Sequence, residues 1–168
     1  KMSKKIIFTT GGTGGHIFPA INLMKNFSEK GYEVLLVTDT RGESFIEKYS
    51  EIKSYIIKTS TLTNKNLIQK ISSTFIILCS MIKATFILKK EKPDLIFGFG
   101  GYVSFPISFA SKFFNLPLVI YENNMVLGRA NKYLSPISKK ILVAKKIMQY
   151  FPAKYNSKIC EVGTILNK

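Results

Sequence analysis

Short apolar runs alternate with longer segments of mixed character along most of this chain. The runs are rich in Ile, Leu and Val, and most of the segments between them are long enough to form helices. Buried strands that alternate with helices are typical of a parallel sheet covered on both faces. We therefore predict an α/β fold with a Rossmann-like, doubly wound parallel sheet, whose ligands bind beyond the carboxyl ends of the strands. The predicted strands are residues 5–9, 33–38, 54–58, 94–98, 118–122 and 140–143.

The segment from about residue 66 to residue 90 is apolar on more than one side of a helix. One helical stripe consists of Leu67, Ile71, Phe75, Leu78, Ile82 and Phe86. The apolar surface is extended around the helix by Ile76, Ile77, Met81, Ile87 and Leu88. A helix that covers a sheet needs only one such stripe. Lys83 interrupts this apolar segment. The charge-free stretch that remains is shorter than the roughly 20 residues that span a bilayer.

Two interpretations of this segment remain open. Its outer face enters an anionic membrane interface, helped by the lysines around it, or it is a core helix that packs against a further domain. For the first interpretation, we expect the docking residues to be Ile76, Ile77, Ile87 and Lys83.

Basic residues outnumber acidic ones in a chain of 168 residues, a length that fits one domain and is short for two. The 25 Lys and Arg residues against 10 Asp and Glu residues give a net charge of +15. Nucleic acid, an anionic membrane surface and a phosphorylated substrate are partners of suitable charge. Base-edge and bidentate phosphate readout favour arginine. Because Arg41 and Arg129 are the only arginines, we expect no nucleic-acid partner.

The two cysteines carry little chemical signal. Cys79 and Cys160 are too few for a disulfide framework, and neither has a partner at metal-ligand spacing. We expect both to be reduced and structural, and we expect neither a metal nor a cofactor. The apolar run that follows the first lysines is too short for a signal peptide, which predicts a cytoplasmic location.

A glycine loop at residues 11–19 directly follows the first predicted strand and contains the only histidine, His16. The next segment has helical apolar spacing, so the glycines connect a strand to a helix. Glycine permits a close backbone approach, and a helix amino terminus presents free N–H groups, which together suit a phosphate. The loop lacks the Lys of a Walker loop and the third glycine of a dinucleotide fingerprint. A tight turn without a ligand is the alternative.

Two further predicted strands end in loops of similar character. The second glycine loop, residues 98–106, includes Gly100, Gly101 and Tyr102, and Ser104 is its expected helix N-cap. The third loop, residues 122–128, begins with Glu122, Asn123 and Asn124, whose carboxylate and amide groups suit sugar hydroxyls. Glu122 is a candidate general base or an orienting group.

These three loops, in this order, resemble the MurG family of glycosyltransferases, and the resemblance covers essentially the whole chain. The matching stretches are Gly-Gly-Thr-Gly-Gly-His, Gly-Gly-Tyr-Val-Ser and, from residue 122 to 134, Glu-Asn-Asn-Met-Val-Leu-Gly-Arg-Ala-Asn-Lys-Tyr-Leu. The family consists of peripheral membrane enzymes of bacterial peptidoglycan synthesis. They transfer N-acetylglucosamine from UDP-N-acetylglucosamine to lipid I, which is undecaprenyl-pyrophosphoryl-N-acetylmuramyl-pentapeptide, and form lipid II.

The resemblance implies a GT-B architecture, in which two Rossmann-like domains face each other across a cleft. Residues 1–168 would be the N-terminal acceptor and membrane-docking domain at the cytoplasmic face of the inner membrane. The C-terminal domain, which holds most of the donor in that family, is absent from this chain, so we expect the chain alone to be inactive. A non-catalytic subunit of a split glycosyltransferase that recruits a separate donor-binding partner is the alternative.

The resemblance also implies roles for individual residues. Thr13, Gly14, Gly15 and Asn124 would approach the donor, and the glycine loops would face the acceptor pyrophosphate. In an inverting transfer, the C4 hydroxyl of the N-acetylmuramyl residue attacks the anomeric carbon of the donor. His16 is then either the base or a hydrogen-bond donor to phosphate or sugar.

Four positions depart from the family pattern. Tyr121 replaces a usual histidine, Asn123 a usual glutamine, Phe105 a usual glycine, and Asn167 an arginine that contacts the donor. The last change puts that donor contact in doubt. A weaker alternative, a nucleotide-binding oxidoreductase domain, rests on Asp39 at the end of the second predicted strand, where an NAD enzyme places its ribose-binding acid.

Overall fold

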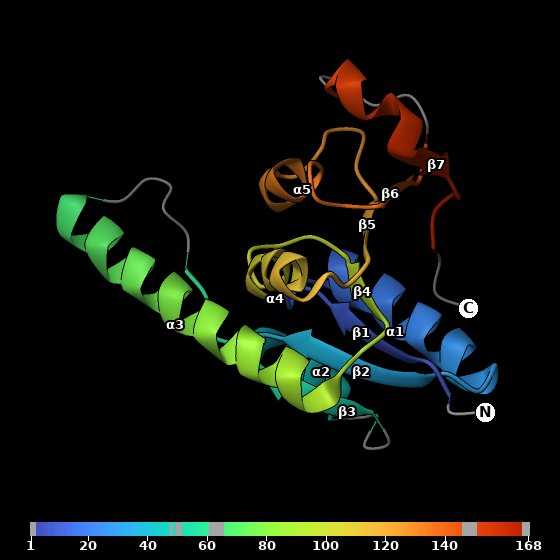
Figure 1. Cartoon of the computed structure of the whole chain (residues 1–168), viewed down its shortest axis with the longest axis horizontal. Coiled ribbons are helices and arrows are strands. Elements are labelled where there is room, and N and C mark those ends of the chain that lie inside the picture. The colour runs from blue at the N-terminus through green and yellow to red at the C-terminus, as the bar shows by residue number, and fades with distance from the viewer. Residues whose placement is uncertain (1–2, 48, 50–51, 61–65, 146–150, 166–168) are drawn as a thin grey trace.

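The protein is a seven-stranded sheet with helices on both faces (Figure 1). A computed structural model describes residues 3–47, 49, 52–60, 66–145 and 151–165. The strands are β1 (Lys5–Thr9), β2 (Glu33–Thr38), β3 (Lys53–Ile56), β4 (Leu95–Gly98), β5 (Leu118–Glu122), β6 (Lys140–Val143) and β7 (Ile159–Glu161). The α-helices are α1 (Gly14–Glu29), α2 (Thr40–Ile46), α3 (Leu67–Glu91), α4 (Ser104–Ala110) and α5 (Arg129–Leu134). Two 3₁₀ helices are η1 (Ser111–Phe114) and η2 (Ala153–Lys158).

All pairings within the sheet are parallel, and the strand order is β3-β2-β1-β4-β5-β6-β7. The chain runs outward from β1 to β3, crosses back through α3 and continues outward again from β4. The order of strands therefore reverses between β1 and β4, where open α/β sheets bind their ligands. The first and second glycine loops follow these two strands, and the third loop follows the neighbouring β5. This arrangement confirms the predicted doubly wound fold.

The sheet separates two apolar cores because successive strand residues point to opposite faces. Ile6 and Phe8 of β1 pack with α1 and α2, whereas Ile7, between them, packs on the face covered by α3, α4 and α5. Phe8, Phe97 and Phe99 stack against one another in the first core, with centroid distances from 4.9 to 6.2 Å. Both faces are thus filled, which leaves the carboxyl edge of the sheet for the loops.

An ionic cluster joins the start of β1, the start of β3 and the end of α3, opposite the carboxyl edge of the sheet. Glu91 is only 4% exposed and accepts hydrogen bonds from Lys5 at 3.2 Å, from Lys53 at 2.8 Å and from the hydroxyl of Tyr55. Burial by itself raises the pKa of Glu91, but the hydrogen bonds from Lys53, Tyr55 and Lys5 lower it to about 2. The carboxylate is therefore kept charged and fixes the end of α3 to the sheet.

Helix α3 is long and lies across one side of the molecule (Figure 1). Asn66 and Gln69 form a capping box at its start. Its inner face is made of small or aliphatic residues: Ser73, Ser80, Ala84, Ile87 and Leu88. Two of these, Ser80 and Ser73, are hydrogen-bonded to the carbonyl oxygen of Lys58 and to Ser60, respectively. The segment after β3 therefore determines which face of α3 is buried.

The predicted docking face of α3 needs a correction. Ile87 is 4% exposed and belongs to the core, so it is not available to a membrane. Ile76 and Ile77 are half-buried, and Lys83 is exposed and donates to the carbonyl oxygen of Ile56 at 2.7 Å. The outward face is instead the stripe of large residues, which we call the α3 outer stripe: Leu67, Ile68, Ile71, Phe75, Leu78, Ile82 and Phe86.

Within the described residues, α3 alone is long and apolar enough to cross a bilayer by length and composition. In its most apolar 18-residue window, 28% of the residues are buried inside the protein. A core helix of a soluble protein meets the same criterion, so length and composition do not distinguish spanning from packing on a surface.

Candidate active site

Of the four glycines in the first glycine loop, only Gly12 has no room for a side chain. A Cβ on Gly12 would lie 2.2 Å from the backbone nitrogen of Gly42, and one on Gly11 would lie 3.6 Å from Cα of Gly101. A Cβ on Gly14 would contact only the ring of Phe18, at 3.4 Å, and nothing lies within 4 Å of a Cβ on Gly15. Gly15, in the first turn of α1, thus faces open space although glycine is unfavourable in a helix.

The second glycine loop rests against the first. Gly100 and Gly101 have φ values of +81° and +79°, a conformation that favours glycine. The amide of Gly11 donates to the carbonyl oxygen of Gly100 at 3.3 Å, and a Cβ on Gly101 would lie 3.2 Å from the backbone of Gly11. The glycines of the first and second loops therefore let the two loop backbones come into contact at the point where the strand order reverses. The predicted N-cap at Ser104 is wrong: Val103 occupies the N-cap position of α4 without a side-chain capping bond, and Ser104 Oγ donates to the carbonyl oxygen of Gly101.

Glu122 organises the third loop and uses both of its carboxylate oxygens to do so. Oε1 accepts from the backbone and side-chain amides of Asn124 at 3.1 and 2.9 Å. Oε2 accepts from the amide of Gly128 at 2.9 Å and from Nδ2 of Asn131 at 3.0 Å. The side chain is 2% exposed. Of its two predicted roles, this geometry favours orientation of the loop over proton transfer, because every acceptor position is already filled.

A pocket of about 280 Å³ opens where the three loops meet. His16, half-buried in the first turn of α1, lies on one side of it, and Cε1 of His16 would be 3.6 Å from a Cβ on Gly100. The pocket is lined by His16, Gly100, Gly101, Tyr102, Glu122, Asn124, Gly128, Arg129, Ala130 and Asn131. The structure thus brings together the only imidazole, the second glycine loop and the loop that Glu122 organises.

The remaining predicted site residues that the structure describes are not among those that line the pocket. Thr13 and Gly15 are exposed and Gly14 is half-exposed at the start of α1, open to solvent rather than within the pocket lining. Asn123 is directed to the sheet, where its Oδ1 accepts from the hydroxyl of Tyr121 at 3.2 Å. The position of Asn167 lies outside the described residues.

Four lining residues, at positions 128–131, are missing from the sequence prediction. The most informative is Asn131, which is 1% exposed and donates from Nδ2 to the carbonyl oxygen of Tyr121 and to Glu122. Its partners are ten and nine residues away along the chain, so no local periodicity reveals the contact. Its presence inside the matched stretch 122–134 is the signal that could have pointed to it.

Tyr121 connects this loop to the segment that follows β7. Its hydroxyl lies 3.2 Å from the amide of Ile165, which donates to it, and 3.3 Å from the carbonyl oxygen of Gly163. Burial raises the pKa of the Tyr121 hydroxyl. The tyrosine is therefore a neutral bridge between the end of β5 and the outgoing chain.

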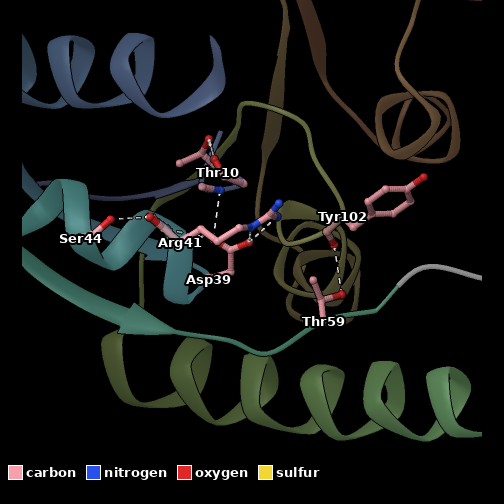
Figure 2. A network of polar contacts seen from close by, with 9 residues as sticks. Thr10, Asp39, Arg41, Ser44, Thr59 and Tyr102 are labelled. Carbon is pink, nitrogen blue, oxygen red and sulfur yellow. Dashed lines mark hydrogen bonds and ion pairs between the residues drawn. The ribbon is translucent and has the colours of Figure 1, made fainter. Parts of the chain in front are cut away.

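Asp39 has a structural role that differs from ribose binding. Its Oδ1 accepts from the amides of Gly12 at 3.1 Å and Gly42 at 3.0 Å, and so caps α2. Its Oδ2 accepts from Nε and Nη2 of Arg41 at 2.9 and 2.6 Å (Figure 2). With both oxygens engaged, Asp39 gives no support to the oxidoreductase alternative.

The fold and the pocket define the class: a Rossmann-like half of a GT-B glycosyltransferase, with its site at the carboxyl edge of the sheet. Residues 6–143 match the family model described as the glycosyltransferase family 28 N-terminal domain, and the chain belongs to this family.

Similar proteins of known name agree with this membership. A relative from Haemophilus ducreyi (strain 35000HP / ATCC 700724) is 36% identical over 168 residues, which are 99% of this chain and 45% of the relative. One from Histophilus somni (strain 129Pt) is 38% identical over 142 residues, 84% of this chain and 40% of the relative. Both are named UDP-N-acetylglucosamine--N-acetylmuramyl-(pentapeptide) pyrophosphoryl-undecaprenol N-acetylglucosamine transferase.

Solved structures give the same result for the fold. The crystal structure of Acinetobacter baumannii MurG superposes with a TM-score of 0.82 at 31% identity, covering 98% of this chain and 47% of that one. A UDP-GlcNAc 2-epimerase from Neisseria meningitidis, at 18% identity and a TM-score of 0.66, shares the fold alone. The chain spans about half the length of the curated relatives it matches.

Proposed function

We propose that this chain is the acceptor-binding part of an enzyme that transfers N-acetylglucosamine from UDP-N-acetylglucosamine to a lipid-linked acceptor, lipid I. The observation that carries the proposal is the pocket between His16 and the loop organised by Glu122, in a chain of glycosyltransferase family 28. The names of the relatives supply the reaction, and the pocket supplies a place for it.

In the proposed reaction, the C4 hydroxyl of the N-acetylmuramyl residue attacks the anomeric carbon of the donor. A new C–O bond forms as the bond between that carbon and the UDP oxygen breaks, and UDP leaves with the bonding electrons. His16 accepts the proton of the hydroxyl. An imidazole suits this role near neutral pH, and His16 lies beside the pocket, in the first turn of α1. Hydrogen bonding from His16 to phosphate or sugar is the competing role.

Other loop residues have positioning roles in this proposal. Glu122 holds Asn124 and Asn131 in place through the hydrogen bonds that they donate to it, and the side-chain carbonyl oxygen of Asn124 is the group proposed to meet sugar hydroxyls at the pocket. The open faces of Gly14 and Gly15 allow a ligand backbone or phosphate to approach the amino terminus of α1. In this proposal a second domain, which the resemblance implies, supplies most donor contacts; the chain spans about half the length of its relatives. Without that domain, residues 1–168 are expected not to turn over.

We also propose that the α3 outer stripe docks onto an anionic membrane surface at the cytoplasmic face. Phe75 and Phe86 are 68% and 67% exposed, and an apolar stripe of this length is costly to leave in water. Lys70 and Lys89 on the same helix are exposed and could contact lipid phosphates. Docking through this stripe would place the pocket near a lipid-linked acceptor.

The experiment that tests the function is a transfer assay with the full-length protein that carries this chain. Labelled UDP-N-acetylglucosamine and lipid I are supplied together, and the label in the lipid product is measured. We expect label in lipid II. Hydrolysis of the donor without transfer, or transfer only to an acceptor that lacks the lipid pyrophosphate, would show that the acceptor is wrongly assigned.

A further inference from the structure

Arg41 forms an ion pair with Asp39, the residue that also caps α2 and binds the first glycine loop. Nε and Nη2 of its guanidinium both donate to Oδ2 of Asp39, while Oδ1 of Asp39 holds the amides of Gly12 and Gly42. Figure 2 shows the guanidinium extending from α2 toward the side of the molecule that carries Tyr102. The capping of α2 needs only Oδ1, so the pairing of Oδ2 with Arg41 serves to orient the arginine.

Close packing places this arginine at the loop. A Cβ on Gly12 would lie 2.6 Å from the carbonyl carbon of Arg41, and one on Gly42 would lie 2.0 Å from Oγ1 of Thr38. The glycine at position 12 therefore lets the loop approach the first turn of α2, and the glycine at position 42 lets that turn pack against Thr38 of β2. The backbone of Arg41 thus lies against Gly12, the residue before Thr13, which is the N-cap of α1.

The ion pair leaves most of the Arg41 side chain exposed to solvent. The side chain of Arg41 is 66% exposed, and an ion pair with one exposed partner contributes little to folding stability. Two donors of the guanidinium are used on Asp39, and the remaining N–H groups of its fork form an edge of the kind that binds phosphate. The adjacent end of α1 is also positive, since Thr13 makes no side-chain cap bond and the first turn holds no acidic residue. Asp39 thus links the guanidinium of Arg41 to Gly12, two residues before the amino terminus of α1.

We propose that Arg41 is an anion-binding residue that holds a phosphate or pyrophosphate group over the first glycine loop. The inference deepens the proposed function and rests on it for the identity of the ligand. The pyrophosphate of a lipid-linked or nucleotide-linked sugar and the phosphate of an anionic lipid headgroup share the required chemistry. The orientation by Asp39 lowers the entropy cost of forming two parallel hydrogen bonds to such a group.

The test measures binding, not turnover, in the full-length protein that carries this chain. Inorganic pyrophosphate is titrated by calorimetry into the wild type and into Arg41→Gln, Arg41→Lys and Lys112→Gln. Lys112→Gln is the matched control, because it removes one exposed positive charge from η1, which precedes β5 and so lies at the opposite edge of the sheet. A parallel arm measures sedimentation with phosphatidylglycerol vesicles, and thermal midpoints confirm that each variant is folded.

We expect Arg41→Gln to weaken pyrophosphate binding about tenfold, Arg41→Lys to fall between it and the wild type, and Lys112→Gln to stay within about twofold of the wild type. A loss confined to the vesicle arm would assign the same phosphate site to a lipid headgroup. Equal binding of Arg41→Gln and wild type in both arms, or no binding by the wild type in either arm, would overturn the inference. Because neither arm requires transfer of a sugar, these results are independent of whether the proposed reaction occurs.

Discussion

Substitution of Glu122 separates an orienting role from a proton-transfer role. In Glu122→Gln, one terminal oxygen keeps its two donors, but the new amide nitrogen faces two groups that are also donors. Two hydrogen bonds to a charged acceptor are lost, each worth about 1.5–3 kcal/mol. Because three of the four bonds are only partly buried, we take the lower end and expect a loss of about 3 kcal/mol in the free energy of unfolding.

The assay is thermal unfolding of the full-length protein together with kcat/KM for transfer. For a domain of this size, the expected loss corresponds to a fall in Tm of about 6–12 °C. Glu161→Gln, at an exposed position on β7, is the control and should leave both quantities unchanged. If Glu122→Gln abolished transfer while the free energy of unfolding changed by less than about 1 kcal/mol, the orienting role would be refuted and a base role favoured.

Three further predictions concern stability and docking. Gly15→Ala should raise the free energy of unfolding by about 0.5–1 kcal/mol and weaken ligand binding, whereas Gly12→Ala should destabilise the fold because its Cβ meets backbone at 2.2 Å; urea unfolding of both variants checks this. Glu91, with a pKa lowered from 4.5 to about 2, should add about 3 kcal/mol of stability above pH 4.5 that is lost as the pH falls toward 2, and a pH series of urea midpoints should be flatter for Glu91→Gln. Ile82→Ser should reduce sedimentation with anionic vesicles without loss of stability, whereas Ile87→Ala should cost about 2–5 kcal/mol; vesicle binding that is unchanged in Ile82→Ser would contradict docking through the α3 outer stripe.

The sheet could be read from the sequence because parallel strands buried on both faces are nearly continuous apolar runs. The runs at β1, β2, β5 and β6 have the predicted bounds, and those at β3 and β4 differ by one or two residues at their ends. The strand that escapes prediction is β7, Ile-Cys-Glu, which is short and mostly exposed. It pairs with β6 at the edge of the sheet, so burial imposes no apolar pattern on it.

The inner face of α3 could not be predicted because periodicity alone does not say which apolar stripe is buried. The larger residues, such as Phe75 and Phe86, point outward, while Ser80 and Ala84 point inward. The small residues allow close packing, and Ser80 forms a hydrogen bond to the segment after β3, a contact that only the tertiary structure creates. A large apolar residue is therefore a poor guide to burial in a helix with two apolar faces.

The candidate site was predicted in outline, since glycines and polar residues at the ends of parallel strands converge at one edge. The glycines nevertheless have different roles, which only their surroundings distinguish. Gly12 makes room for α2, while Gly15 has free space around it. Likewise, the carboxylate of Glu122 is identified by position as chemically interesting, and its contact with Asn131 shows that it holds the loop together.

The central claim, that the pocket beside His16 is where the acceptor hydroxyl reacts, is tested most directly by kcat/KM for sugar transfer in the full-length His16→Ala variant. With His16 as the general base, kcat/KM should fall by at least about 100-fold, and the exposed control Lys112→Ala should match the wild type. If His16→Ala kept most of the wild-type kcat/KM, the reaction would not depend on this imidazole and the assignment would be wrong.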